Sequence, residues 1–93
     1  MNIKKLKKDR KKIDIIDKKL FNLIKKRTSI INHMLGLKQF KNQIVDRNRI
    51  KAILNKIKNK SKKNKIDPKI TLKIWKSMIW AYVDYQKRNF KIK

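Results

Sequence analysis

The chain has 93 residues, which fits one domain over residues 1–93, and 30 Lys plus Arg against 6 Asp plus Glu give it a formal net charge of +24. It has no Cys, which excludes disulfides and thiolate chemistry, and only one Gly and one Pro, which disfavours strands and tight turns. No apolar run approaches the roughly 20 residues of a membrane span, and no apolar segment of a secretory signal follows the basic N-terminus, so we expect a cytoplasmic protein with no membrane partner.

Residues 3 to about 38 predict one long helix, because apolar residues recur at steps of three and four with Gly36 near the end. These residues are Ile13, Ile16, Leu20, Leu23, Ile30 or Ile31, Met34 and Leu37. The helix would be roughly 50 Å long, whereas a compact domain of this size is about 30 Å across. The stripe cannot be buried within one monomer, so we expect an obligate dimer in which the long helices are interleaved.

A second, shorter helix is predicted after a polar loop at residues 39–45. Asp46 is suited to be its N-cap, and its apolar residues again have helical spacing: Ile50, Ile53, Leu54 and Ile57. The apolar spacing is lost at residues 59–65, where we expect a solvated loop.

Asp67 and Pro68 predict the start of a third helix, with Asp as N-cap and Pro at the first position. Its expected apolar stripe consists of Ile70, Ile74, Met78, Tyr82, Tyr85 and Phe90. The predicted fold class is therefore all-α, with one long and two shorter helices in each chain of an intertwined dimeric bundle.

The positive charge has two explanations. A basic surface gains affinity for nucleic acid by releasing phosphate counterions, but 25 of the basic residues are Lys and five are Arg, and Lys, Ile and Asn share A/T-rich codons. The Lys residues are spread along the whole chain, while most aromatic residues lie on the third helix, which does not favour a base-stacking surface. We expect no nucleic-acid partner, with a basic binding module as the alternative.

In a chain that uses Lys so freely, each Arg is informative, because its planar fork binds carboxylates with two hydrogen bonds. Arg27 and Lys38 are 11 residues apart, which on a helix is within about 20° of whole turns, so a small anion between them could contact both. Arg10 and Arg27 are roughly 25 Å apart and face differently. They could meet on one ligand only in an antiparallel dimer; otherwise each is a surface Arg that covers apolar groups.

Plainer alternatives exist for three further residues. Asp46 and Arg49 could form only a cap and a surface ion pair, and Tyr82 could simply pack in the core. Gln86, on the same face as Tyr82, is a neutral amide where the stripe would allow an apolar residue. His33 is the only histidine, and with no Cys and few carboxylates nearby we expect a structural or surface role and no metal site.

The segment of residues 9–27 resembles the first helix of the all-helical chorismate mutases, whose marks match Arg10, Ile13, Asp17, Leu20 and Arg27. The resemblance continues along nearly the whole chain. It includes a Gly-x-Lys ending at Lys38, an Asp-x-x-Arg motif at Asp46 and Arg49, and a glutamine at Gln86, 19 residues after Asp67.

This resemblance implies a homodimeric isomerase of aromatic amino-acid biosynthesis, in the shikimate pathway, that rearranges chorismate to prephenate without cofactor or metal. Arg27 would clamp one substrate carboxylate and Arg10 of the partner subunit the other. Lys38 and Gln86 would hydrogen-bond the ether oxygen, while Arg49 and the helix start near Asp46 would support the ring end.

Two positions depart from the mutase pattern. Ile50 stands where these mutases usually carry Glu, which can accept a hydrogen bond from the ring hydroxyl, and Tyr82 stands where a small polar residue is common. Both features resemble the related isochorismate pyruvate lyases, which use the same fold and a similar cationic pocket. The resemblance therefore leaves two substrates, chorismate and isochorismate.

Overall fold

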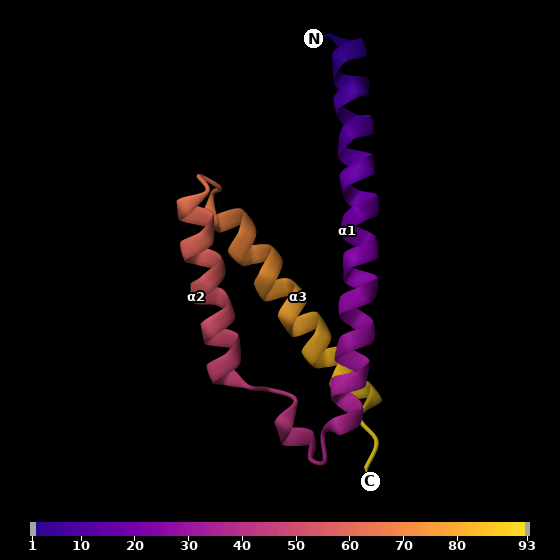
Figure 1. Ribbon diagram of the computed structural model, residues 1–93, viewed down its shortest axis with the longest axis vertical. Coiled ribbons are helices and arrows are strands. Elements are labelled where there is room, and N and C mark those ends of the chain that lie inside the picture. The colour runs from indigo at the N-terminus through magenta and orange to yellow at the C-terminus, as the bar shows by residue number, and fades with distance from the viewer. Residues whose placement is uncertain (1, 93) are drawn as a thin grey trace. The chain divides into compact units, whose positions relative to one another are not determined.

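The computed structural model describes residues 2–92 as helices joined by short loops (Figure 1). Helix α1 spans Ile3–Leu37, the short 3-10 helix η1 spans Lys41–Gln43, α2 spans Arg47–Lys63 and α3 spans Pro68–Asn89. No strand occurs within residues 2–92. The predicted all-α class, with one long and two shorter helices, is confirmed.

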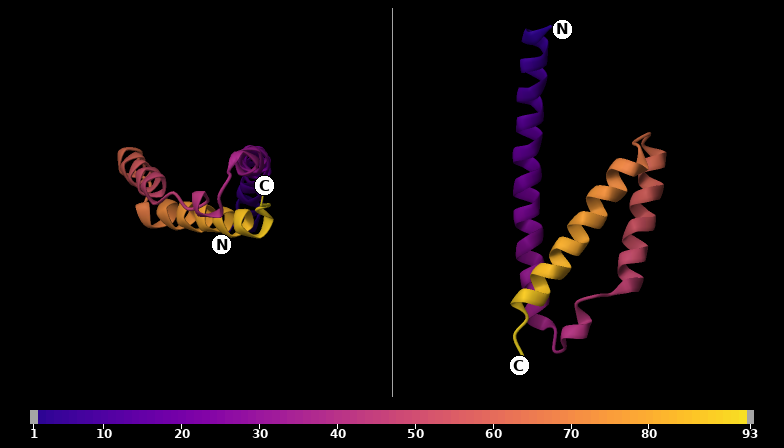
Figure 2. Two further views of the ribbon diagram at one scale, coloured as in Figure 1. Left: turned by 90° about the horizontal axis from the view of Figure 1, so that it is seen from below. Right: turned by 180° about the vertical axis from the view of Figure 1, so that it is seen from behind.

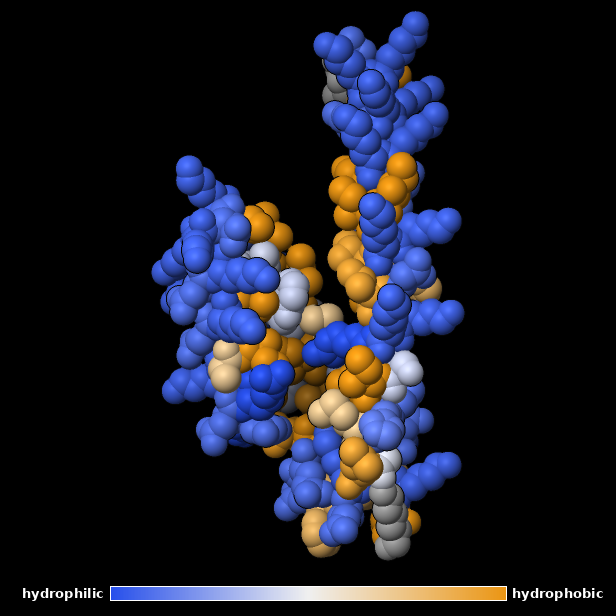
Figure 3. All heavy atoms as spheres, in the orientation of Figure 1, coloured by the Kyte–Doolittle hydropathy of each residue, from blue (hydrophilic) through white to orange (hydrophobic). Residues whose placement is uncertain are grey.

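The chain divides into two compact units, Met1–His33 and Met34–Lys93, with the boundary inside α1. Where it is described, the first unit is a stretch of a single helix, so it has no second element to cover its apolar side chains. The space-filling view shows these side chains along the middle of α1 (Figure 3). The stripe residues Ile13, Ile16 and Leu20 are 50–55% exposed.

The second unit contains a small apolar core where the end of α1, the following loop and α3 come together. Leu35, Ile44 and Val83 are 9%, 5% and 4% exposed, and Val45 and Phe90 pack against them. At the end of α1 the buried residue is therefore Leu35, which lay outside the predicted stripe. This core fixes the end of α1 beside the last turns of α3.

Helices α2 and α3 form a hairpin, and each begins at an aspartate cap (Figure 2). An Oδ1 atom of Asp46 accepts from the Arg49 backbone N–H at 3.0 Å, and that of Asp67 accepts from the Lys69 N–H at 2.9 Å. Pro68 is the first residue of α3, where its missing N–H costs no helical hydrogen bond. Both predicted helix starts are confirmed.

The solvated loop expected at residues 59–65 is wrong, because α2 continues through Lys63. Lysine is a good helix former, so a run of Lys does not by itself end a helix. The buried face of α2 also extends into this segment, where the buried residue is the polar Ser61, 4% exposed. Its hydroxyl lies 2.6 Å from both the Ile57 carbonyl oxygen and Thr71 Oγ1.

The helix ends instead in a Schellman motif. The N–H of Ile66 donates to the carbonyl of Ser61 at 2.9 Å, and the N–H of Lys65 donates to that of Lys62 at 3.2 Å. Lys65 has a φ of 56°, the left-handed conformation that this motif requires. The last carbonyls of α2 are thereby paired within a tight turn.

The buried face of α3 is rotated from the predicted stripe. Ile70 and Ile74, the first two residues of that stripe, are 57% and 53% exposed in the single chain. The most buried residues of α3 are Ile79, Val83 and Gln86. The simple step-of-four pattern selected one apolar row, but α3 carries apolar residues on more than one side, and packing within the second unit buries the neighbouring row.

Candidate functional site

The site begins with a hydrogen bond between Lys38, just beyond the end of α1, and Gln86 near the end of α3. Lys38 Nζ donates to Gln86 Oε1 at 2.7 Å. The amide is 5% exposed, and its Nε2 donates to the Tyr82 carbonyl oxygen one turn earlier at 3.2 Å. The neutral amide on the apolar face therefore orients a lysine ammonium from a segment 48 residues away. Tyr82 itself is half-buried.

The Lys38 ammonium is electrostatically perturbed. Partial burial lowers its pKa below the ordinary lysine value of 10.5, because desolvation penalises the charged form, and the carboxylate of Asp46 opposes this shift. Asp46 thus has two roles, since it also caps α2. Its position at the helix start brings a negative charge close to the lysine.

An open cavity of about 1110 Å³ surrounds this pair of charges. Its lining comes from the end of α1, η1, the start of α2 and the end of α3: Lys38, Lys41, Asn42, Gln43, Val45, Asp46, Arg47, Asn48 and Lys87. The lining holds four cationic side chains and one carboxylate. The surplus of positive charge suits an anionic ligand.

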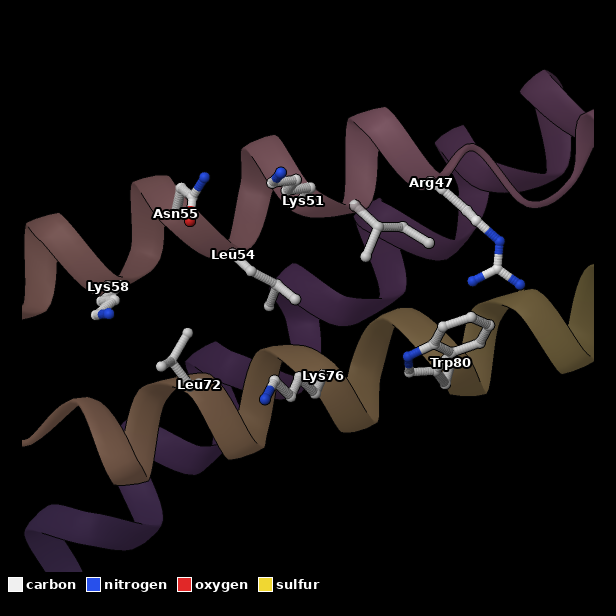
Figure 4. Close-up of a pocket in the computed structure, with 9 residues that line it drawn as sticks. Arg47, Lys51, Leu54, Asn55, Lys58, Leu72, Lys76 and Trp80 are labelled. Atoms are coloured by element: carbon white, nitrogen blue, oxygen red, sulfur yellow. The ribbon is translucent and has the colours of Figure 1, made fainter.

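A second cavity, of about 360 Å³, lies in the groove between α2 and α3 (Figure 4). Its floor is apolar and its rim is cationic, and the lining residues are Arg47, Ile50, Lys51, Leu54, Asn55, Lys58, Leu72, Lys76 and Trp80. In the close-up, Leu54 and Leu72 point into the space between the helices, and the Arg47 guanidinium extends toward α3 on the side of Trp80. Arg47 lines both this groove and the larger cavity.

Of the predicted site residues, the structure therefore brings Lys38, Gln86 and Asp46 into one neighbourhood. Arg49 is exposed, and it lines neither of these two cavities. Its backbone N–H, not its guanidinium, makes the hydrogen bond with Asp46. The roles predicted for these side chains toward a substrate remain predictions.

Arg10 and Arg27 both lie on α1 in the first unit. Arg10 is exposed and Arg27 is half-buried. Their separation of 17 residues corresponds to roughly 25 Å along a helix, so one small ligand cannot contact both within one chain. Their meeting across a dimer remains a prediction.

Sequence reasoning missed Arg47, Lys87 and Trp80 as cavity residues. Arg47 carried a signal, since it is one of only five arginines, but the three-residue spacing of Asp46 and Arg49 indicated Arg49 instead. For Lys87 no signal existed among so many lysines.

The only histidine, His33, is exposed on α1. Within residues 2–92, no three side chains of the His, Cys, Asp or Glu type are grouped as a metal site requires. The same residues contain no helix with the length and apolarity needed to cross a membrane.

Comparison with known proteins gives one finding. A family model described as chorismate mutase type II matches residues 9–87, which covers most of each unit and all the predicted site residues. Neither the curated proteins nor the solved structures give a match.

Proposed function

Since this chain belongs to the chorismate mutase type II family, whose model matches residues 9–87, we propose that it rearranges chorismate to prephenate. The observation that carries this proposal is the 2.7 Å hydrogen bond from Lys38 to the buried Gln86, beside a cavity with surplus positive charge. The family makes the chain an enzyme of the chorismate mutase kind; the choice of reaction and the roles of individual residues are the proposal.

The reaction breaks one C–O bond and forms one C–C bond within a single molecule, and no proton or electron is transferred. Negative charge grows on the ether oxygen as the C–O bond breaks. The Lys38 ammonium has three N–H donors and gives one to Gln86, so two can point at that oxygen. The Gln86 amide uses one N–H on the Tyr82 carbonyl and has a second. Donors placed in advance stabilise the transition state more than the ground state.

The rest of the proposed catalysis is conformational. Arg27 binds one substrate carboxylate and Arg10 of the partner subunit binds the other, which holds the folded, reactive conformer. Arg49, Tyr82 and the start of α2 beside Asp46 support the ring end. No cofactor is required, because every bond change is internal to the substrate.

The proposed dimer is supported by two unfilled complementary surfaces. The apolar stripe of α1 is exposed, with Ile13, Ile16 and Leu20 at 50–55%. The groove between α2 and α3 also presents apolar side chains, among them Ile50, Leu54 and Leu72. We propose that the α1 helix of a second copy packs against this groove, which would bury apolar surface on both sides. Residues 1–93 would then act as one domain of a cytoplasmic homodimer.

Isochorismate pyruvate lyase is the second candidate, and the lining of the groove favours it. Ile50, which stands where a mutase usually carries Glu, is half-buried in a groove whose lining contains no carboxylate. A ring hydroxyl there would lack the usual acceptor. Elimination of pyruvate from isochorismate needs the same cationic clamps but not that acceptor.

Product identification separates the two candidates. The purified chain is incubated with chorismate and, separately, with isochorismate, and the products are separated chromatographically. Prephenate from chorismate at the higher kcat/KM supports the mutase, whereas pyruvate and salicylate from isochorismate at the higher kcat/KM support the lyase. Turnover of neither substrate above the uncatalysed rate would overturn both.

A further inference from the structure

Arg47 is the first residue of α2, and it lines both the larger cavity and the α2–α3 groove of the second unit. On one side it shares the larger cavity with Lys38 and Asp46. On the other it shares the α2–α3 groove with Ile50 and Trp80. A ligand that extended from one cavity into the other would therefore lie beside Arg47.

An arginine at position 47 does not stabilise α2. The N-terminus of a helix carries partial positive charge and favours acidic side chains, so a cation there is unfavourable by about 0.3–1 kcal/mol. The first turn of α2 itself has no acidic residue, and the carboxylate of the N-cap Asp46 accepts from the Arg49 backbone N–H. No hydrogen bond or ion pair found in residues 2–92 uses its guanidinium. Helix stability therefore does not account for an arginine at this position, whereas an anionic ligand would.

Arg47 and Arg49 are not equivalent on α2. Two residues on a helix are separated by about 200°, so the side chains leave the helix in nearly opposite directions. Only Arg47 of the two lines the cavities described above. The two arginines therefore cannot both act on a ligand there in the same way.

We propose that Arg47 is a further substrate-binding residue, whose guanidinium adds a second cation to the substrate carboxylate held by Arg10 of the partner subunit and so sets the orientation of the ring. This inference rests on the proposed function. With the ether oxygen at Lys38 and a carboxylate on Arg47, the apolar part of the ring lies toward Ile50 and Trp80. Arg47 thus determines which edge of the ring faces position 50, where the two candidate reactions make different demands.

The test compares Arg47→Ala, Arg47→Lys and the control Arg88→Ala, which removes an exposed arginine from the last turn of α3 away from both cavities. Steady-state kinetics on chorismate and on isochorismate are combined with calorimetric titration of prephenate, a dicarboxylate that is not turned over. For Arg47→Ala we expect KM on the preferred substrate to rise, and prephenate binding to weaken, by about 10- to 100-fold. The change in kcat should be smaller. Arg47→Lys should recover only part of this loss, because an ammonium lacks the two-armed geometry, and Arg88→Ala should stay within about twofold of the parent protein in both measurements.

Loss of the fold would not imitate this result, since removing a cation from the start of α2 should leave its thermal stability equal or higher. Unchanged prephenate binding in Arg47→Ala overturns the inference, and so does a parent protein that does not bind prephenate. If the parent turns over neither substrate but binds prephenate in an Arg47-dependent manner, the proposed function falls and the role of Arg47 as a carboxylate-binding residue stands.

Discussion

At the residue scale, the central contact is the hydrogen bond that Lys38 donates to Gln86. It matters because the buried Gln86 amide holds the charged Lys38 ammonium in a defined position. Lys38→Ala should lower kcat by about 10²–10³-fold, the usual cost of losing one well-placed donor to a developing oxyanion. Rates measured at saturating substrate, with circular dichroism as a check of folding, test this. Lys56→Ala, an exposed position on α2 outside both cavities, is the control. Near-parental kcat in a folded Lys38→Ala protein would remove Lys38 from the mechanism.

The charge of Asp46 should affect the pH dependence of kcat/KM. In the proposed mechanism Lys38 is protonated, so kcat/KM should fall as the pH rises through the pKa of this lysine, which burial places below 10.5. Asp46→Asn keeps a good helix cap but removes the carboxylate that raises this pKa. The alkaline limb of kcat/KM should therefore move to lower pH. Lys41, Arg47 and Lys87, which line the same cavity, keep their charges in this variant.

The matched control is Asp67→Asn, which makes the same substitution at the cap of α3, a residue that does not line the Lys38 cavity. The alkaline limb of the kcat/KM profile of Asp67→Asn should coincide with that of the parent protein. A limb that stays in place in Asp46→Asn as well would mean that Lys38 does not control the alkaline loss of activity.

Ile50 tests which reaction the groove is suited to. Ile50→Glu supplies an acceptor for a ring hydroxyl, and a missing hydrogen bond to such a buried group costs about 1–3 kcal/mol. We expect kcat/KM on chorismate to rise and kcat/KM on isochorismate to fall. Ala52→Glu, at an exposed position that lines neither cavity, introduces the same charge as a control. Unchanged activity on both substrates would show that position 50 does not face the ligand.

At the scale of elements, the turn after α2 contains a strained residue. Lys65 has a φ of 56°, a conformation that costs a residue with a side chain roughly 1–2 kcal/mol and that glycine adopts freely. Lys65→Gly should raise the free energy of unfolding by up to about 1 kcal/mol, because glycine also gives up more freedom on folding. Urea titration measures the change. Lys63→Gly, inside the last turn of α2, should instead lower stability by roughly 0.5–1 kcal/mol. A loss of stability in Lys65→Gly would contradict the left-handed turn.

Much of the fold could be predicted from the sequence, because helix starts depend on local chemistry. The Asp46 and Asp67 caps and Pro68 depend on neighbouring residues and were predicted. The end of α2 was not, because Ser61 continues the buried face through a hydroxyl contact with Thr71, which apolar spacing does not reveal. The row of α3 that is buried within one chain depends on which neighbours pack against it, and Ile70 and Ile74 of the expected stripe are exposed there.

The candidate site was predictable only where a residue type stood out. Gln86 was noticeable as an amide on an apolar face, and the structure pairs it with Lys38. Arg47 became a cavity residue only through the direction in which the start of α2 points. Two arginines two residues apart cannot be ranked from spacing until the neighbours of the helix are known.

At the scale of the whole molecule, the exposed stripe of α1 and the separation of Arg10 from Arg27 predict shared sites in a dimer. Arg10→Ala and Arg27→Ala proteins should each be nearly inactive. Mixing them with subunit exchange should restore about a quarter of parental activity, because half of the dimers are then mixed and each has one site with both arginines. Sedimentation equilibrium should give twice the chain mass of 11.3 kDa at micromolar concentration.

Two results would contradict the shared site. One is a stable, helical monomer at micromolar concentration. The other is an absence of recovered activity although mass spectrometry of tagged subunits demonstrates exchange.

The hydroxyl pair of Ser61 and Thr71 has a consequence for how the hairpin is aligned. Their oxygens lie 2.6 Å apart, and Ser61 is buried between α2 and α3. Sliding α3 along α2 by one turn would exchange apolar residues for other apolar residues at little cost, but it would separate the two hydroxyls and lose the hydrogen bond between them, which is worth about 0.5–1.5 kcal/mol. The pair therefore fixes the register of α3 against α2 at the end of the hairpin where the two helices are joined. Through the length of the two helices, it determines which residue of α3 lies opposite Arg47 at the open end.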